Sequence, residues 1–437
     1  MARVRTATSK LLMVLAVATA GTLWLNAQTI RHHKIAVEDP NAENLAQAET
    51  AIQKKDFPSA LDLLNKVVAA DPKNYEAWFD LGFVNNALGK PSDAIAAYRQ
   101  SVAAKPDVFE SNLNLGLMLV RAGQPGAEQF LRAATKLTPI AHVAEGKEQA
   151  WLALGHVLEK SNPEEAIEAF EEASKLQPND IEPYLSGGPI LEQQKRLPEA
   201  EQMYKRAVAL DPQSVDAVTG LANVYLSSHR LPEAQDAIKK LLALRPNDIG
   251  AHMELGRILA ASGKPDEAIA ELEIAEHAQP GDATLQREIA DLLMAQKKYA
   301  EAESQYQLLV AKNPNDAELH ATIGRALLHQ KKFADAQQEL LTALRLKPDM
   351  GSVYGDLAIV ADQNQNYPLT IRALDIRAKF LPELPATYFM RASAYDHLHD
   401  EKHAAENYHR FLEVADGKSP DQEWQAKHRL IAIEPRK

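Results

Sequence analysis

Residues 75–106 read YEAWFDLGFVNNALGKPSDAIAAYRQSVAAKP, and they contain the pattern that indicates the kind of fold. Two apolar helical segments flank Leu88-Gly89-Lys90-Pro91, a sequence typical of the end of one helix and the start of the next. The second segment is rich in alanine and closes at a proline, Pro106. The stretch therefore predicts a helical hairpin.

The closing proline recurs along most of the chain. It stands at Pro72, Pro106, Pro139, Pro178, Pro212, Pro246, Pro280, Pro314, Pro348 and Pro382. Seven of the nine spacings are 34 residues, one is 33 and one is 39. The period divides the chain into eleven hairpins: 41–74, 75–108, 109–141, 148–180, 181–214, 215–248, 249–282, 283–316, 317–350, 351–384 and 385–417. A final helix is expected near Asp421–Ile433.

Other positions recur with the proline. One hairpin has Trp78, Leu81, Gly82, Ala94 and Tyr98, and another has Trp151, Leu154, Gly155, Ala166, Phe170 and Ala173. This pattern resembles the tetratricopeptide repeat, whose unit has 34 residues. The resemblance implies an all-α fold: a right-handed α-solenoid superhelix of about eleven hairpins with a C-terminal capping helix. Small residues such as Gly256 and Ala268 would let the two helices of a hairpin approach closely, and stacking of hairpins would close the core.

Several units depart from the repeat pattern, most clearly at an insertion and at an internal proline. The extra residues from Ile140 to Lys147 lengthen the connection between the third and fourth hairpins, and we expect them to form a loop, with a local bend of the stack as the alternative. Pro189 falls within a predicted first helix and is expected to kink or shorten it.

Composition excludes several classes of function. The 437 residues include no cysteine, which excludes disulfides, thiolate metal sites and cysteine nucleophiles. Lys plus Arg number 48 against 60 for Asp plus Glu, a net charge of -12, so nucleic acid is not an expected partner. Zinc-protease, phosphate-loop, dinucleotide-binding and nucleophile-elbow motifs are absent from the sequence. We therefore expect no enzymatic activity and no cofactor.

The N-terminus has the layout of a signal peptide. Arg3, Arg5 and Lys10 precede an apolar run at 11–25, which is short for a membrane-spanning helix, and Ala27 suits a cleavage point before Gln28. An uncleaved anchor formed by 11–25 is the alternative. The expected divisions are a signal peptide or anchor (1–27), a tether (28–40), the repeat solenoid (41–417), and a capping helix with tail (418–437).

The first helix of each hairpin is the expected binding face, because in the family that this chain resembles these helices line a concave groove. The candidate groove residues are Phe79, Phe83, Asn86, Asn223, Met253, Arg257, Arg287, Asp291, Met294, Arg325 and His329. Phe79 and Phe83 form an apolar part, whereas the arginines form a basic stripe flanked by methionine. Arginine can hold a peptide carboxylate through paired hydrogen bonds, and methionine adapts to an apolar side chain.

Two local alternatives remain open. The three arginines can instead pair with acids of the stack such as Asp291, Glu254 or Glu288. A dense polar group near the last hairpin turn contains ligand types that suit zinc or nickel, but its spacing matches no specific metal site and favours a polar turn. Its members are Asp396, His397, His399, Asp400, His403 and His409.

The sequence thus predicts a non-enzymatic scaffold that binds partner proteins or extended peptides in the concave groove. The signal-like N-terminus favours export to the periplasm or cell envelope. The resemblance to repeat subunits of envelope machinery implies a role in assembly or secretion. The alternatives are an accessory subunit of an envelope enzyme complex or glycan-export machinery, or a cytoplasmic adaptor anchored to the inner membrane.

Overall fold

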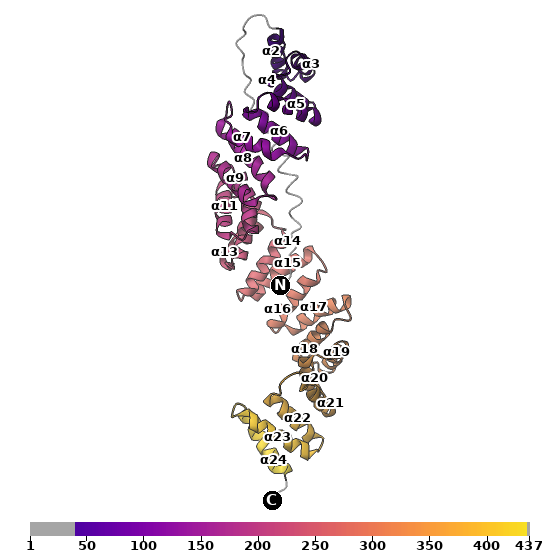
Figure 1. Ribbon diagram of the computed structural model, residues 1–437. Coiled ribbons are helices and arrows are strands. Elements are labelled where there is room, and N and C mark those ends of the chain that lie inside the picture. The colour runs from indigo at the N-terminus through magenta and orange to yellow at the C-terminus, as the bar shows by residue number, and fades with distance from the viewer. Residues whose placement is uncertain (1–39, 435–437) are drawn as a thin grey trace. The chain divides into compact units, whose positions relative to one another are not determined.

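α-Helices form all the regular structure of residues 40–434, the part of the chain that this computed structural model describes. The described residues form 23 helices and no strand, so the all-α prediction is confirmed. The helices fall into two units, one ending at Leu244 and the other beginning at Arg245. Figure 1 shows the helices within each unit stacked in chain order.

Unit 1 contains six helical hairpins. Its helices are α2 (Pro40–Gln53), α3 (Phe57–Ala70), α4 (Tyr75–Ala87), α5 (Pro91–Ala104), α6 (Phe109–Arg121), α7 (Ala127–Lys136), α8 (Val143–Leu158), α9 (Pro163–Leu176), α10 (Glu182–Gln193), α11 (Leu197–Leu210), α12 (Val215–Ser227) and α13 (Leu231–Leu244). Each even-numbered helix packs most extensively against the odd-numbered helix that follows it. The predicted hairpins are therefore the packing units.

Unit 2 contains five hairpins and a final helix. Its helices are α14 (Ile249–Ala261), α15 (Pro265–Ala278), α16 (Ala283–Ala295), α17 (Tyr299–Lys312), α18 (Ala317–His329), α19 (Phe333–Leu346), α20 (Gly351–Gln363), α21 (Tyr367–Arg377), α22 (Pro385–His397), α23 (Glu401–Ala415) and α24 (Pro420–Ile433). Helix α24 buries Ala426 and Leu430 against the apolar cluster of the last hairpin, which contains Phe411. It thus covers the open side of that hairpin, as a terminal cap must.

Local chemistry explains where the helices begin. The side chains of Asp248, Asp282 and Asp316 accept hydrogen bonds from backbone N–H groups in the first turns of α14, α16 and α18. Such caps satisfy donors that have no partner inside the helix. Several second helices begin with proline at the first or second position, where its missing N–H costs little. Caps and prolines together set the hairpin boundaries.

Close approach of the two helices in a hairpin depends on residues without a large side chain. A Cβ atom placed on Gly82 would lie 2.6 Å from the Tyr98 ring, and one on Gly155 would lie 2.6 Å from the Phe170 ring. The corresponding distance at Gly256 is 2.7 Å to Leu272 Cγ. In these three hairpins, a large residue of the second helix therefore fills the space that the glycine leaves free.

The residues inserted before the fourth hairpin do not form the predicted loop. Helix α8 begins at Val143, so residues 143–147 extend this first helix at its N-terminal end. Gly146 in this extension packs closely against Pro139 and Phe109. A Cβ atom at Gly146 would lie 3.0 Å from Pro139 Cγ and 3.3 Å from Phe109 Cε1. Apolar contact with the preceding hairpin thus turns most of the insertion into helix. Pro189 lies inside α10, which continues beyond it to Gln193.

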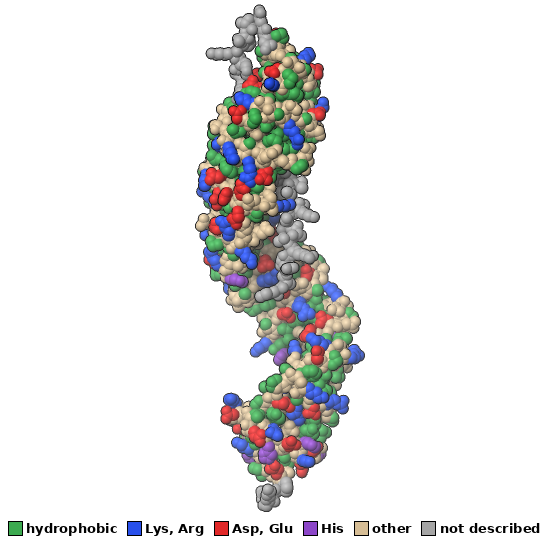
Figure 2. Space-filling view, viewed as in Figure 1, with side chains coloured by type: hydrophobic (Ala, Val, Ile, Leu, Met, Phe, Trp, Pro, Cys, Tyr) green, Lys and Arg blue, Asp and Glu red, His purple; other side chains and the backbone are tan. Residues whose placement is uncertain are grey.

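Ion pairs connect successive hairpins at the turn between first and second helices. Arg196 pairs with Glu164 at 2.8 Å and Arg230 with Glu201 at 2.7 Å in unit 1. In unit 2, Lys298 pairs with Asp266 at 2.8 Å and Lys332 with Glu303 at 3.1 Å. Figure 2 shows basic side chains beside acidic ones on the visible face. The basic side chain of each pair is about one third exposed or more, so water and salt weaken these contacts.

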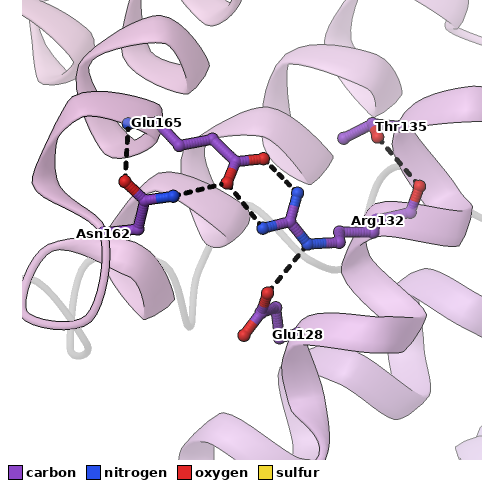
Figure 3. A network of polar contacts seen from close by, with 5 residues as sticks. All are labelled: Glu128, Arg132, Thr135, Asn162 and Glu165. Atoms are coloured by element: carbon purple, nitrogen blue, oxygen red, sulfur yellow. Dashed lines mark hydrogen bonds and ion pairs between the residues drawn. The ribbon is translucent and has the colours of Figure 1, made fainter.

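Arg132 makes the densest of these connections (Figure 3). From α7, its Nε donates to Glu128 Oε1 at 2.8 Å, and its terminal nitrogens donate to both carboxylate oxygens of Glu165 on α9. Asn162 also donates to Glu165, at 2.9 Å. The Arg132 hydrogen bond is the main cause that holds the pKa of Glu165 below its ordinary value. The network thus holds α7 against α9, and its polar groups are used in contacts within the protein.

Candidate functional site

All the candidate groove residues lie on first helices of hairpins. Phe79, Phe83 and Asn86 lie on α4 and Asn223 on α12, so these four belong to unit 1. The unit 2 residues are Met253 and Arg257 on α14, Arg287, Asp291 and Met294 on α16, and Arg325 and His329 on α18. The candidates therefore form two separate sets, one in each unit.

The aromatic residues of the unit 1 set are partly used in packing. The Phe79 ring lies 5.6 Å from the Tyr98 ring of the same hairpin, and the Phe83 ring meets the Phe57 ring edge-on at 6.2 Å. Both phenylalanines are half-buried, as is Asn86, whereas Asn223 is exposed. Each phenylalanine thus presents only part of its ring at the surface.

An acidic group lies beside these rings. Removal of Asp80 from water, with the nearby Glu49 and Glu76 carboxylates, raises the pKa of Asp80 to about 8. Its carboxyl group is therefore mainly protonated at neutral pH, and can donate a hydrogen bond.

Arg257 is held by two carboxylates of its own unit. Its Nε lies 3.1 Å from Glu288 Oε2, and one terminal nitrogen donates to Glu288 Oε1 at 2.9 Å. The other terminal nitrogen donates to Glu254 Oε1 at 2.6 Å. These hydrogen bonds to Glu288, outweighing burial, raise the pKa of the guanidinium above its ordinary value. The pairing that the sequence left open as an alternative is present at Arg257.

Arg325 and Arg287 differ in how firmly they are held. Arg325 Nε donates to Asp356 Oδ2 at 2.7 Å, the same first-helix to first-helix pairing that joins Arg257 and Glu288. Arg287 makes a looser contact, 3.6 Å from Asp316 Oδ2, and its side chain is 43% exposed. Arg287 therefore keeps the most unused donor capacity of the three.

The remaining unit 2 candidates surround these arginines with mixed chemistry. Asp291 accepts a hydrogen bond from the Tyr306 hydroxyl, and the His329 ring stacks on Tyr299 at 4.5 Å. Met253 and Met294 are half-buried and pack against the unit 2 core. Arg287, Asp291 and Met294 are spaced by four and three residues, so they lie along one face of α16.

The polar group near the last hairpin turn does not converge. Asp396 is bound by Arg429, His397 stacks on Tyr367, and His409 lies 2.7 Å from Glu434. His399 occupies the left-handed turn position, and His403 lies beside Asp400. Within residues 40–434, no group of three potential metal-ligating side chains is placed to hold an ion. The structure thus distributes these residues among separate packing contacts.

Sequence reasoning missed a recurring hydrogen bond of the first helices. In five hairpins, the side chain six residues after the recurring proline hydrogen-bonds that proline's carbonyl oxygen. The pairs are Trp78 with Pro72, Asn112 with Pro106, Tyr184 with Pro178, His252 with Pro246, and His320 with Pro314. The available signal was a donor-bearing residue at a fixed offset from the proline. This position joins each first helix to the end of the preceding hairpin.

Two of these residues are buried histidines with acceptors at both ring nitrogens. His252 Nδ1 lies 2.6 Å from Glu271 Oε2, and its Nε2 lies 2.9 Å from the Pro246 carbonyl oxygen. His320 has the same arrangement with Glu339 and Pro314. At His252, only the imidazolium can donate to both acceptors. Burial alone would lower the pKa of His252, but the Pro246 carbonyl and Glu271 outweigh it and raise that pKa.

Unit 1 contains two further groups with strongly raised pKa values. Burial, reinforced by the Asp180 and Glu182 carboxylates, raises the pKa of Glu148 to about 9. At His156, burial opposes protonation, but Glu159 and Glu182 outweigh it and raise the pKa to about 9. At neutral pH Glu148 is therefore mainly neutral and His156 mainly charged.

We expect the folded chain to lose stability as pH rises from about 6 to 9. Asp80, Glu148, His156 and His252 all bind a proton more tightly in the folded state, so the folded state holds more protons than the unfolded state in this window. The contribution of each histidine is complete below its ordinary pKa and is lost as pH rises through the raised value. Denaturant midpoints measured against pH check this.

Glu148→Gln serves as the control for the pH dependence, because an amide imitates the protonated carboxyl group. The variant should show a shallower decline and exceed the parent in stability at pH about 9. A midpoint that rises between these pH values in the parent chain would contradict the assignment.

Comparison with known proteins identifies the class of repeat. Two family models, both described as tetratricopeptide repeat, match residues 191–258 and 293–358 in one case, and 45–107, 86–142, 152–215 and 253–317 in the other. The second alone covers more than half of the chain. The chain belongs to the tetratricopeptide repeat family, whose members serve as protein-interaction scaffolds.

A curated relative and several solved structures are similar to parts of the chain. Tetratricopeptide repeat protein 37 of Xenopus laevis is 32% identical over 87 residues, which are 20% of this chain and 6% of that protein. The chain thus matches a small fraction of that relative's length.

The structure of YrrB, described as a TPR protein with an unusual peptide-binding site, is 24% identical and covers 43% of this chain and 96% of its own, with a TM-score of 0.38. The C-terminal part of a TPR repeat-containing protein from Cytophaga hutchinsonii is 15% identical over 55% of this chain and 97% of its own, with a TM-score of 0.45. Yeast Tom70 is 14% identical over 90% of this chain and 96% of its own, with a TM-score of 0.33.

Proposed function

We propose that this protein is a non-enzymatic scaffold that binds a partner protein or extended peptide on the first-helix face of unit 2, in assembly or secretion at the cell envelope. The observation that carries the proposal is the state of Arg287. Its loose contact with Asp316 at 3.6 Å and its 43% exposure leave guanidinium donors available for a carboxylate.

The neighbours of Arg287 suit a peptide better than a lone anion. Met294 lies two turns further along the same face of α16 and is half-buried, so it offers a deformable apolar contact beside the charge. Arg257 and Arg325, held by Glu288 and Asp356, keep the flanking first helices in place. Arg257 and Arg325 therefore stabilise the packing of the first helices, while Arg287 contacts the partner.

Arg287→Gln should weaken capture of partners from source-cell extract about tenfold, because a hydrogen bond to a charged group contributes about 1.5–3 kcal/mol. The measurement is quantitative crosslinking and mass spectrometry with the full chain. Arg410→Gln is the matched control, since Arg410 also makes one 3.6 Å ion pair and is exposed, but lies on the second helix α23. Equal capture by the parent and by folded Arg287→Gln would overturn the proposal.

The cell-envelope part of the proposal depends on the N-terminal sequence. The signal-like segment and the tether to residue 39 lie outside the described residues, and no described helix is long and apolar enough to cross a membrane. Export with cleavage predicts a mature N-terminus near Gln28 in protein from the source cell. An intact N-terminus in the cytoplasmic fraction would contradict export.

A further inference from the structure

A groove lies between second helices of hairpins in unit 2, whereas the candidate residues described above lie on first helices. It runs between the second helices α19 and α21, with the first helix α20 at its base, and encloses a volume of about 270 Å³. None of the candidate residues of the first-helix face lines it. We call it the α19–α21 groove.

The floor and walls of the α19–α21 groove are apolar. Leu344 and Leu357 are buried at its base, and Leu369 and Ile376 are half-buried along its wall. Leu341 also lines the groove, and its side chain is 42% exposed. Exposure of an aliphatic side chain to water is unfavourable. The groove therefore offers surface that an apolar side chain of a partner would cover.

Aromatic surface continues from the groove. Tyr354 lines it and stacks on Phe380, with the rings nearly parallel at 6.3 Å. Phe380 is 46% exposed, and Leu384, four residues further along the connection to α22, is 51% exposed. Contact area is therefore available beyond the groove itself.

Two arginines give the groove its charge. Arg345 and Arg372 line it, both are exposed, and neither makes a hydrogen bond or ion pair with any residue of the described range 40–434. Arg257, Arg325 and Arg391 in the same unit each contact a carboxylate. The guanidinium groups of Arg345 and Arg372 thus remain available beside an apolar groove.

Two acidic side chains on the same two helices are engaged by other residues. Asp375 on α21 pairs with Arg391 at 3.1 Å, and Glu339 on α19 lies against His320. The lining of the groove contains no Asp or Glu. The Tyr354 hydroxyl also makes no hydrogen bond within the described range, which adds a neutral donor to the two charged ones.

We propose that the α19–α21 groove binds an acidic peptide segment of a partner protein, with an apolar side chain in the groove and flanking Asp or Glu carboxylates on Arg345 and Arg372. Charge complementarity selects this occupant: the groove is basic, whereas the chain as a whole carries a net charge of -12. Two arginines suit a pair of carboxylates. The groove is separate from the first-helix face, so the chain would hold two partner segments at once.

The test uses the full chain and an array of short peptides, each with a central pair of large apolar residues. In one set the flanking positions are Asp or Glu, and in the matched set they are Asn or Gln. The acidic set should bind, and binding should weaken at least about tenfold for each of Arg345→Gln and Arg372→Gln. Leu341→Lys should also weaken it by placing a charge in the apolar wall.

A control variant and hydrogen exchange test where the peptides bind. Arg410→Gln should leave binding of the acidic peptides unchanged, because this exposed arginine lies on α23 and does not line the groove. Hydrogen exchange with bound peptide should show added protection in α19 and α21. Circular dichroism checks that each variant is folded, which we expect because Arg345 and Arg372 are exposed and unpaired.

Several outcomes would overturn the proposal. One is equal binding of the acidic and the amide peptides. Another is full binding by a folded double variant that carries both Arg345→Gln and Arg372→Gln. A third is protection from hydrogen exchange on α14, α16 and α18 instead of α19 and α21. Sedimentation with phosphatidylglycerol vesicles that depends on both arginines, without acidic-peptide binding, would assign the groove to a membrane. Self-association that is lost in the double variant would assign it to a second copy of this chain.

Discussion

Replacing Arg391 by leucine is expected to lower the free energy of unfolding by about 3–5 kcal/mol, the range for breaking a buried ion pair by removing one partner. Arg391 is 7% exposed, and its guanidinium donates to Glu383 Oε1 at 2.7 Å and lies 3.1 Å from Asp375 Oδ1. These contacts join α22 to α21 and to the connection between them. Loss of the arginine leaves Glu383 without its charged partner in a site that is only 20% exposed.

Arg410→Leu provides the control for Arg391→Leu. Arg410 belongs to the following helix and its contact with Glu413 is exposed, so its loss should change stability by less than about 1 kcal/mol. Denaturant unfolding followed by circular dichroism measures both variants. Equal midpoints for the two would show that the buried pair does not support the packing of the last two hairpins.

Gly256→Leu is expected to destabilise unit 2 by about 1–3 kcal/mol, because it forces extra volume into a close helix crossing. A Cβ at Gly256 would already lie 2.7 Å from Leu272 Cγ and 3.1 Å from the backbone oxygen of Ala268. The leucine can shift, but the backbone oxygen cannot move without displacing α15. The unfolding midpoint of the full chain measures the effect.

Gly355→Ala separates crowding from the intrinsic effect of removing a glycine. A Cβ at Gly355 would meet Arg377 at 3.5 Å, an ordinary contact, so alanine should be neutral or stabilise by up to about 1 kcal/mol through helix propensity. Gly256→Ala should be destabilising in the same assay. A Gly256→Leu midpoint equal to that of the parent would contradict the assignment of this position to the crossing.

The hairpin architecture could be predicted because its determinants are local and periodic. Pro106 and its counterparts, with the turn at Leu88–Pro91, mark the boundaries in the sequence itself. The segment 143–147 was predicted wrongly because its helix depends on contacts of Gly146 with Pro139 and Phe109, which the period does not contain. Tertiary contact decided the conformation there.

The candidate site was less predictable because pairing depends on which faces meet. The sequence placed Arg257, Arg287 and Arg325 on first helices, where the structure has them. It could not distinguish the two held by Glu288 and Asp356 from Arg287, because those carboxylates lie 31 residues away on the next first helix. The α19–α21 groove was missed for the same reason, since three helices must come together before it exists.

The most direct test of the scaffold account is site-specific photocrosslinking in the source cell. A photoreactive phenylalanine analogue is placed at Met294 on the first helix α16, and in a second variant at Leu308 on the second helix α17 of the same hairpin. Leu308 is 50% exposed, so it offers ample access to any protein that touches that side. Met294 should give discrete partner crosslinks that weaken with Arg287→Gln, and Leu308 should give no crosslinks to these partners. Crosslinks of the same partners from Leu308 but not Met294 would contradict it.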